Sequence, residues 1–268
     1  HLVYVDNRIT YKGAFLNLFS EHSYMLDRYR SKEYRQKLCE LLKNHRYDII
    51  QMDSLSSLLY LETARQYSSA KIFYRPQNVE SQISSRILEI TANPIKRLYL
   101  QIQANRLQIF EWEAIKKVDV VLPLSFSDEA IFRKNASAKV FFFFVCMSIN
   151  QELPQCLHAG DIFFIGAMDW APNAEGLSWF LKNIWPAITQ EFASLSFFVA
   201  GSKMPDWMRQ LKSKNVIPVG EVENAQEFMQ EHGVMVAPIL TGSGIRIKVI
   251  EAMALGKVVI ATRMAAEG

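Results

Sequence analysis

The strongest constraint on the fold is an alternation, repeated along the chain, between short apolar runs and longer amphipathic stretches. Runs rich in β-branched and aromatic residues, such as Lys71–Tyr74 and Val258–Ala261, alternate with segments that have the apolar spacing of helices. Short apolar strands of this kind are typical of a parallel sheet buried on both faces, in which each helix joins two parallel strands. The alternation therefore predicts an α/β protein.

The alternation falls into two series, and 268 residues leave room for about two domains. We predict two doubly wound, Rossmann-like domains, residues 1–150 and 151–268, that face a cleft, with a hinge between Val145 and Asp161. The strands expected in the first series are Leu2–Val5, Asp48–Met52, Lys71–Tyr74, Asp119–Leu122 and Lys139–Val145. Those expected in the second are Asp161–Ile165, Leu195–Val199, Val216–Val219, Val234–Ala237 and Val258–Ala261.

Helices are expected between these strands. Ser125, followed three residues later by Asp128, is typical of a capping box that opens a helix. Pro186 is expected to end the helix that starts at Asn173. The other expected helices are Ser31–His45, Leu55–Gln66, Val79–Ile90, Pro94–Lys117, Trp207–Lys214, Ala225–His232 and Ile245–Leu255. The aromatic run Phe141–Phe144 is expected to fill a central strand.

The composition excludes several classes of protein. Half of the residues are hydrophobic and 21% are charged, so the chain is not disordered. The net charge is +3 and no Lys/Arg block is dense enough for duplex nucleic acid, so we expect no nucleic-acid partner. Three cysteines without CxxC spacing argue against a disulfide framework or a zinc site, and they fit a reducing compartment.

Two features bear on location. The longest apolar run, Val140–Ile149, is too short to span a membrane, and we expect a cytoplasmic protein. Basic residues gather in Arg86–Arg106, which fits either a solvated helix face or a peripheral contact with the inner face of an anionic membrane. Both interpretations stay open.

The segment 238–248 runs from the end of an expected strand through a loop of small residues into a helix. Gly242 and Gly244 allow a ligand to approach the backbone, and the first amides of a helix are unsatisfied and attract anions. Lys248 and Glu251 lie three residues apart on one helical face, so a cation for phosphate stands beside a carboxylate for ribose hydroxyls. A plain strand-to-helix loop with an exposed Lys–Glu pair fits the same residues.

Residues 242–262 resemble the donor-site signature of the group-1 (family 4) retaining glycosyltransferases, which have the GT-B fold. Weaker similarities extend this resemblance over nearly the whole chain. In the second domain they are the segments 164–170, 198–201 and 219–222, together with Pro172, Asn173 and Gly176. In the first domain they are Asn78-Val79-Glu80 and Leu124-Ser125.

The resemblance implies roles for individual residues. Glu251 would hold the nucleotide ribose, and Lys248 would clamp the diphosphate and stabilise the leaving group, so these two are the candidate catalytic residues. The backbone of Val222 would face the nucleobase. The remaining donor-binding candidates are Gly166, Gly242, Ser243, Gly244, Ile245 and Arg246.

The sequence also departs from the family pattern. Ser243 stands where a glutamate often meets the donor sugar, and Glu175 stands where many members have lysine. Gln77 replaces a histidine of the first domain, so no catalytic histidine is expected, and the five histidines are assigned to surface or linker positions. Arg75 and Gln77, at the end of a strand, are the acceptor-side candidates.

The implied activity is transfer of a sugar, of the hexosyltransferase type and with retention, from a nucleotide diphosphate sugar to a glycan or lipid-linked acceptor, as in polysaccharide biosynthesis. No metal and no cofactor are expected, and Asp53, alone after a strand, is expected to cap the next helix. Family members usually have a further strand before Leu2 and further helices after Gly268, so we expect a chain truncated at both ends. A non-catalytic nucleotide-sugar binding module and an epimerase or phosphorylase of the same fold remain alternatives.

Overall fold

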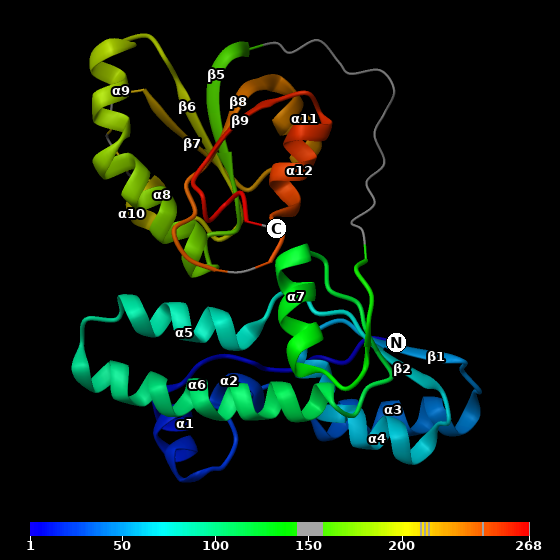
Figure 1. Cartoon of the computed structure of the whole chain (residues 1–268). Helices are drawn as coiled ribbons and strands as arrows, with labels where there is room; N and C mark the ends of the chain where they lie inside the picture. Colours follow the sequence, from blue (N-terminus) through cyan, green and yellow to red (C-terminus); the bar gives the residue numbers. More distant parts are fainter. Residues whose placement is uncertain (144–157, 210, 212, 214, 243, 268) are drawn as a thin grey trace. The chain divides into compact units, whose positions relative to one another are not determined.

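The computed structural model describes residues 1–143 and 158–267, except 210, 212, 214 and 243, and it contains two parallel sheets (Figure 1). The described residues divide into two compact units, one formed by residues 1–143 with 244 and 245, and the other by 158–242 and 246–267. The predicted α/β class is confirmed. The predicted boundary at residues 150 and 151, and most of the predicted hinge, lie outside the described residues and stay predictions.

The sheet of the first unit consists, among the described residues, of parallel strands in chain order. They are β1 (Ile49–Met52), β2 (Lys71–Tyr74), β3 (Val120–Val121) and β4 (Lys139–Val140). Because neighbours in the sheet are also neighbours in sequence, the chain crosses this sheet in one direction. The first unit therefore shows no reversal of strand order among its described strands.

The helices of the first unit include several that local signals explain. Ser125 accepts a hydrogen bond from the Asp128 amide at 3.1 Å and begins α7, as predicted. Asn93 caps α6, which starts with Pro94 in a position that needs no amide donor. The described helices are α1 (Tyr11–Leu16), η1 (Asn17–Phe19), α2 (Tyr24–Asp27), α3 (Lys32–Asn44), η2 (Leu55–Tyr60), α4 (Leu61–Tyr67), α5 (Glu80–Ile90), α6 (Pro94–Ile115) and α7 (Phe126–Asn135).

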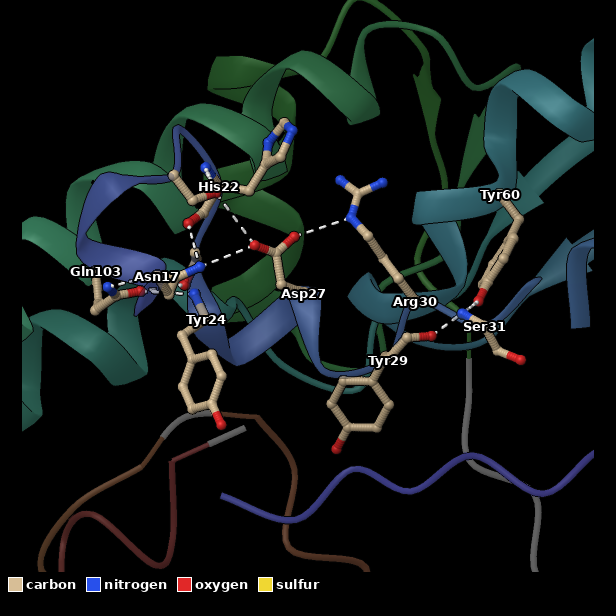
Figure 2. A network of polar contacts seen from close by, with 11 residues as sticks. Asn17, His22, Tyr24, Asp27, Tyr29, Arg30, Ser31, Tyr60 and Gln103 are labelled. Carbon is tan, nitrogen blue, oxygen red and sulfur yellow. Dashed lines mark hydrogen bonds and ion pairs between the residues drawn. The ribbon is translucent and has the colours of Figure 1, made fainter. Parts of the chain in front are cut away.

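The chain before β1 is fastened to α6 by a network of polar contacts (Figure 2). Gln103, which is buried on α6, donates to Asn17 Oδ1 at 2.9 Å and accepts from the Tyr24 amide at 2.7 Å. Asn17 in turn donates to Asp27 Oδ2 at 2.8 Å, and Asp27 pairs with Arg30 at 2.9 Å. These long-range bonds hold short helices that the sequence pattern did not predict.

The sheet of the second unit has the strand order β7-β6-β5-β8-β9, with all neighbours parallel. The chain moves outward from β5 to β7, returns to the other side of β5 and continues to β9, which is a doubly wound arrangement. In such sheets ligands bind beyond the carboxyl ends of the strands, where the order reverses. The strands are β5 (His158–Ile165), β6 (Phe197–Ala200), β7 (Val216–Gly220), β8 (His232–Ala237) and β9 (Val258–Ala261).

Helices cover both faces of this second sheet (Figure 1). On one face α8 (Ala171–Asn183), α9 (Trp185–Glu191) and α10 (Asp206–Arg209) pack on strand residues that include Phe164. On the other, α11 (Ala225–Glu231) and α12 (Ile247–Ala254) pack on residues that include Phe163. Successive side chains of one strand thus enter two cores, which confirms the prediction of a sheet buried on both faces.

Two predicted strands are wrong or too long. Leu2–Val5 is not a strand: Val3 and Val5 are only partly buried, and Leu2 and Tyr4 are almost fully exposed. The strand expected at Lys139–Val145 ends at Val140 in the described part, and Phe141 and Phe143 are 53% and 45% exposed. Because β4 is an edge strand of the described sheet, these rings have no strand on one side to pack against. Phe144 lies outside the described residues.

Some helix limits and one histidine also differ from expectation. Pro186 lies in the first turn of α9 instead of ending a helix, because a first turn needs no amide donor there. The helix expected at Leu55–Gln66 divides into η2 and α4. His232 was assigned to the surface but is 3% exposed, with its ring stacked on Phe198 and Nδ1 4.0 Å from Asp161 Oδ2.

Candidate functional site

The carboxyl ends of the strands in the second unit are bound closely together. The Gly166 amide donates to the Ala200 carbonyl at 3.0 Å, and the Gly201 amide donates to the Gly220 carbonyl at 2.7 Å. A Cβ atom on Gly201 would lie 1.8 Å from the Gly166 carbonyl oxygen, so only glycine fits this approach of β5 and β6. The strands are therefore packed closely at the edge of the sheet where the sequence predicts a ligand.

The loop between β8 and α12 is anchored at its start. The Thr262 hydroxyl, after β9, donates to the Ile239 carbonyl, and its oxygen accepts from the Ala265 amide at 3.1 Å. A Cβ atom on Gly176 of α8 would lie 2.3 Å from the Pro238 carbonyl oxygen. Contacts from β9 and α8 thus fix where the loop leaves the sheet.

The glycines of this loop have the backbone geometry that their positions in the sequence indicated. Gly242 and Gly244 have φ angles of +121° and +77°, in a region of backbone conformation that residues other than glycine rarely adopt. Ser243, between them, lies outside the described residues. The turn made by the two glycines leads the chain directly to the start of α12.

Helix α12 begins two residues later than predicted, at Ile247. Arg246 is its N-cap, with a non-helical ψ of 86°, and its side chain makes no capping bond to the helix. The first amides of a helix have no partners within the helix and carry its positive end. This end of α12 is therefore suited to an anion, as expected from the sequence.

Lys248 lies in the first turn of α12 and is half-buried. Burial lowers the pKa of its ammonium group, while the nearby Glu251 carboxylate acts in the opposite direction. No described residue forms a hydrogen bond or ion pair with the side chain of Lys248. An ammonium group that has lost part of its water and forms no close ion pair is a favourable place for a phosphate group.

Arg246 provides a second cation beside this turn. Its guanidinium carbon lies 5.5 Å from the centre of the Trp170 ring, within range of a cation–π interaction. Trp170 is the N-cap of α8, and its side chain is 37% exposed. A Cβ atom on Gly242 would lie 2.8 Å from Arg246 Nη2, so the glycine also makes room for the arginine.

Sequence reasoning missed an ion pair at the same edge. Lys203 Nζ, after β6, lies 2.6 Å from Asp169 Oδ2, after β5, and this contact lowers the pKa of the Asp169 carboxyl group. Lys203 has a φ of 53°, which is uncommon for a residue with a side chain. Only the strand order shows that residues so far apart in sequence meet.

The other predicted site residues lie as follows. Glu251 is half-buried one turn after Lys248, and Val222 packs partly buried on the core around Phe228. Gly166 is buried, and Ile245 is half-buried. Gly166 follows β5, Val222 follows β7 and Glu251 lies on α12. The individual roles of these residues stay predictions.

Arg75 and Gln77 belong to the first unit, after β2. The Arg75 amide donates to the Met52 carbonyl at 2.8 Å, and its guanidinium carbon lies 5.8 Å from the centre of the Phe143 ring. Arg75 Nε is buried and donates to no described residue, whereas the Gln77 side chain is exposed. An unused buried donor fits the acceptor-side role predicted for Arg75.

Asp53 does not cap the following helix, as had been expected. It accepts from Gln51 Nε2 at 2.7 Å, while the Ser54 side chain caps η2. Among the described residues, no group of three or more His, Cys, Asp and Glu side chains is arranged to hold a metal ion. None of the described helices has both the length and the apolar character that a membrane crossing requires.

The sequence of the second unit matches the model of a known protein family. Residues 159–268 match the family model described as "Glycosyl transferases group 1". The donor-site resemblance inferred from residues 242–262 is thereby confirmed at the level of the family.

One curated relative of this chain is an uncharacterized 44.6 kDa protein in the cps region of Klebsiella pneumoniae. It is 25% identical over 121 residues, which cover 42% of this chain and 31% of the relative. The chain thus spans less than one third of the curated relative that it matches.

Solved glycosyltransferase structures share the fold. A sucrose-phosphate synthase from Thermosynechococcus elongatus has a TM-score of 0.63 and 16% identity, covering 87% of this chain and 61% of its own. TarM has a TM-score of 0.64 and 12% identity, covering 90% and 47%. A variant of TarM from S. aureus, solved with fondaparinux, alpha-GlcNAc-glycerol and UDP, has a TM-score of 0.62 and 12% identity, covering 85% and 44%. The chain therefore has the α/β fold of these GT-B glycosyltransferases.

Proposed function

We propose that this protein transfers a sugar from a nucleotide diphosphate sugar to a glycan or lipid-linked acceptor, with retention and without a metal ion or cofactor. The observation that carries the proposal is the half-buried ammonium group of Lys248 at the start of α12, which forms no hydrogen bond or ion pair with a described residue. It lies beyond the carboxyl ends of a doubly wound sheet, within a group-1 glycosyltransferase domain.

The chemistry follows from where charge develops. As the bond between the sugar and the diphosphate breaks, negative charge builds on the leaving phosphate oxygens. Lys248, Arg246 and the first-turn amides of α12 would stabilise that charge as prearranged positive groups. These groups do the work that a divalent cation does at other sites, so the proposed reaction needs none.

Support for a nucleoside diphosphate comes from geometry and from a relative of similar fold. Glu251 stands one turn beyond Lys248, where its carboxylate can accept hydrogen bonds from ribose hydroxyls while Lys248 holds the diphosphate. We assign the nucleobase to the backbone near Val222. The S. aureus TarM variant with this fold was solved with UDP. The donor-sugar contacts are assigned to the loop from Gly242 to Ile245.

A role in polysaccharide biosynthesis is supported by the relative in the cps region of Klebsiella pneumoniae. On the first unit we assign Arg75 and Gln77 to the acceptor side, since the buried Nε of Arg75 donates to no described residue. We place the protein in the cytoplasm.

We also propose that the protein contacts the inner face of a membrane. Lys96 and Arg97 are exposed at the start of α6, and Ile95 and Leu98 beside them are 82% and 66% exposed. Cations interleaved with apolar side chains suit an anionic lipid surface. Sedimentation with anionic liposomes should exceed that with neutral ones, and the Lys96→Glu/Arg97→Glu variant should lose the difference. Equal sedimentation with both kinds of liposome would refute the contact.

Donor turnover tests the proposed activity against its alternatives. We expect slow release of nucleoside diphosphate from the correct nucleotide sugar alone, and faster release with an acceptor glycan. A non-catalytic binding module would bind the same nucleotide sugar without releasing nucleoside diphosphate under either condition. An epimerase would return a nucleotide sugar of the same mass but altered stereochemistry, which the NMR spectrum of the sugar would reveal.

A further inference from the structure

The N-terminus of α5 lacks a capping side chain of its own. Val79 is its N-cap, and no side chain in the usual position accepts from the first amides. Ser, Thr, Asp or Asn at this position commonly does so, and uncapped amides inside a protein are costly. The amides of Glu80 and Ser81 therefore need a partner from elsewhere in the fold.

Glu111, on α6, supplies that partner. One carboxylate oxygen accepts from the Glu80 amide at 2.9 Å and the other accepts from the Ser81 amide at 3.0 Å. The side chain is fully buried, and no described cation pairs with it. A carboxylate that binds two amides at the positive end of a helix makes strong, directional hydrogen bonds.

The surroundings make this arrangement expensive. Burial raises the pKa of Glu111, the hydrogen bonds from Ser81 and Glu80 lower it, and Asp128 raises it again. Glu80 and the fully buried Tyr74 are the other titratable groups that face the carboxylate. A small polar residue at position 79 would cap α5 without burying a charge, so the cap alone does not account for Glu111.

The segment that Glu111 fixes carries both acceptor-side candidates. Residues 75–79 join the end of β2 to the start of α5. Their first residue is tied to the sheet by the Arg75 amide bond to the Met52 carbonyl, and their last residue precedes the amides held by Glu111. The two attachments come from separate elements, β1 and α6, and the short segment between them contains Arg75 and Gln77.

We infer that Glu111 is a positioning residue: through its two bonds to the start of α5 it holds the segment 75–79, and with it Arg75 and Gln77, in the geometry used for the acceptor. The expected effect of Glu111 on acceptor turnover rests on the proposed function, whereas its expected effect on the conformation of residues 75–79 does not. The two effects are therefore measured in separate experiments.

The structural test compares Glu111→Gln with Glu113→Gln, which changes an exposed residue on the same helix. A glutamine can accept from one amide, but its own NH₂ group opposes the other. We expect amide hydrogen exchange at Glu80 and Ser81 to accelerate by roughly ten-fold or more. The NMR signals of the Arg75 and Gln77 amides should also shift in Glu111→Gln and stay in place in Glu113→Gln. Glu111→Asp, which keeps the charge on a shorter stem, is the milder variant if the glutamine variant does not fold.

Changes confined to residues 80 and 81, with Arg75 and Gln77 unmoved, would show that Glu111 is a helix cap and nothing more, and would overturn the inference.

The kinetic test measures acceptor-dependent release of nucleoside diphosphate, together with calorimetric binding of UDP, GDP and ADP. We expect a lower kcat in Glu111→Gln with nucleoside diphosphate binding unchanged. An unchanged kcat also overturns the inference. If the parent protein binds none of the three nucleotides, the proposed function fails, and the NMR comparison still decides the inference.

Discussion

At the scale of single residues, the half-buried ammonium group of Lys248 forms no ion pair with a described residue, and this distinguishes the loop before α12 from an ordinary strand-to-helix turn. An exposed lysine paired with Glu251 would have fitted the sequence equally well. Burial instead lowers the pKa of Lys248, so part of its hydration is already lost before a ligand arrives. A bound phosphate would replace that lost water with a charge-assisted hydrogen bond.

Replacing Lys248 with alanine should therefore weaken nucleoside diphosphate binding. The lost contact is worth about 1.5–3 kcal/mol, which corresponds to roughly ten- to a hundred-fold in affinity. Glu251→Gln should cost more for a nucleoside diphosphate than for free diphosphate, because it affects only the ribose. Isothermal titration calorimetry measures both, with the exposed Lys182→Ala as a matched control. A folded Lys248→Ala protein that binds as tightly as the parent would place the donor site elsewhere.

Gly176 offers a test of how rigidly the site is built. An added Cβ would lie 2.3 Å from the Pro238 carbonyl oxygen, so α8 or the start of the site loop must move. We expect Gly176→Ala to destabilise the protein by about 1–3 kcal/mol, even though alanine favours helices. Gly160→Ala, where nothing lies within 4 Å of the new atom, should change stability by about 0.5 kcal/mol or less. Denaturant unfolding compares the two, and equal stabilities would contradict the close packing described here.

At the scale of elements, the junction of α5 and α6 concentrates negative charge in the interior of the first unit. Glu80 lies next to Glu111, and burial, followed by the Glu111 charge, raises the pKa of Glu80 to about 7. Figure 1 shows α5 and α6 side by side, and the carboxylates lie where the start of one helix meets the other. This contact joins elements that the sequence pattern treats as independent.

The raised pKa makes stability depend on pH. Because the folded-state pKa of Glu80 exceeds its ordinary value of 4.5, folding disfavours the ionised form. The free energy of unfolding should fall as the pH rises from about 4.5 to about 7, by at most about 3 kcal/mol from this group. Glu80→Gln should flatten that fall without abolishing it, since the pKa of Glu111 is raised as well.

Urea unfolding between pH 5 and pH 8 measures this effect. The exposed Glu89→Gln on the same helix should keep the slope of the parent. A parallel pH dependence for the parent and Glu80→Gln would mean that Glu80 is ionised in the folded protein at little cost.

At the scale of the whole molecule, the two units use parallel sheets in different ways. The described strands of the first sheet follow chain order, whereas the second sheet reverses direction between β5 and β8. Only the second therefore shows a switch point, and the cations Lys248 and Arg246 lie in the loop and helix that follow β8. This difference supports the proposal that the nucleotide binds to the second unit.

Ligand binding should stabilise the folded protein against heat. A nucleotide diphosphate sugar at 100 times its dissociation constant adds about 2.7 kcal/mol, provided that it binds only the folded state. A thermal-shift screen across bases and sugars should therefore single out a few donors. The parent protein should respond to them, and Lys248→Ala should respond less at the same concentration. A shift of equal size in both proteins would point to binding outside the α12 site.

The sequence alone determined the α/β class, most strands of both sheets, the glycine loop and the family whose model residues 159–268 match. These features are local: the periodicity of apolar residues reports helix or strand, and glycine at positions 242 and 244 reports a backbone geometry. Burial of the second sheet on both faces also followed from its uninterrupted apolar runs. Each of these can be inferred from neighbouring residues.

Only the tertiary structure decided which strand lies at an edge, which buried groups meet and where a side chain replaces a missing cap. Phe141 is exposed because β4 has no described neighbour on one side, and His232 is buried because β8 runs beside β5. Glu111 caps α5 across 30 residues of chain. Strand order and helix packing arise from long-range burial of apolar surface, which the pattern of neighbouring residues does not encode.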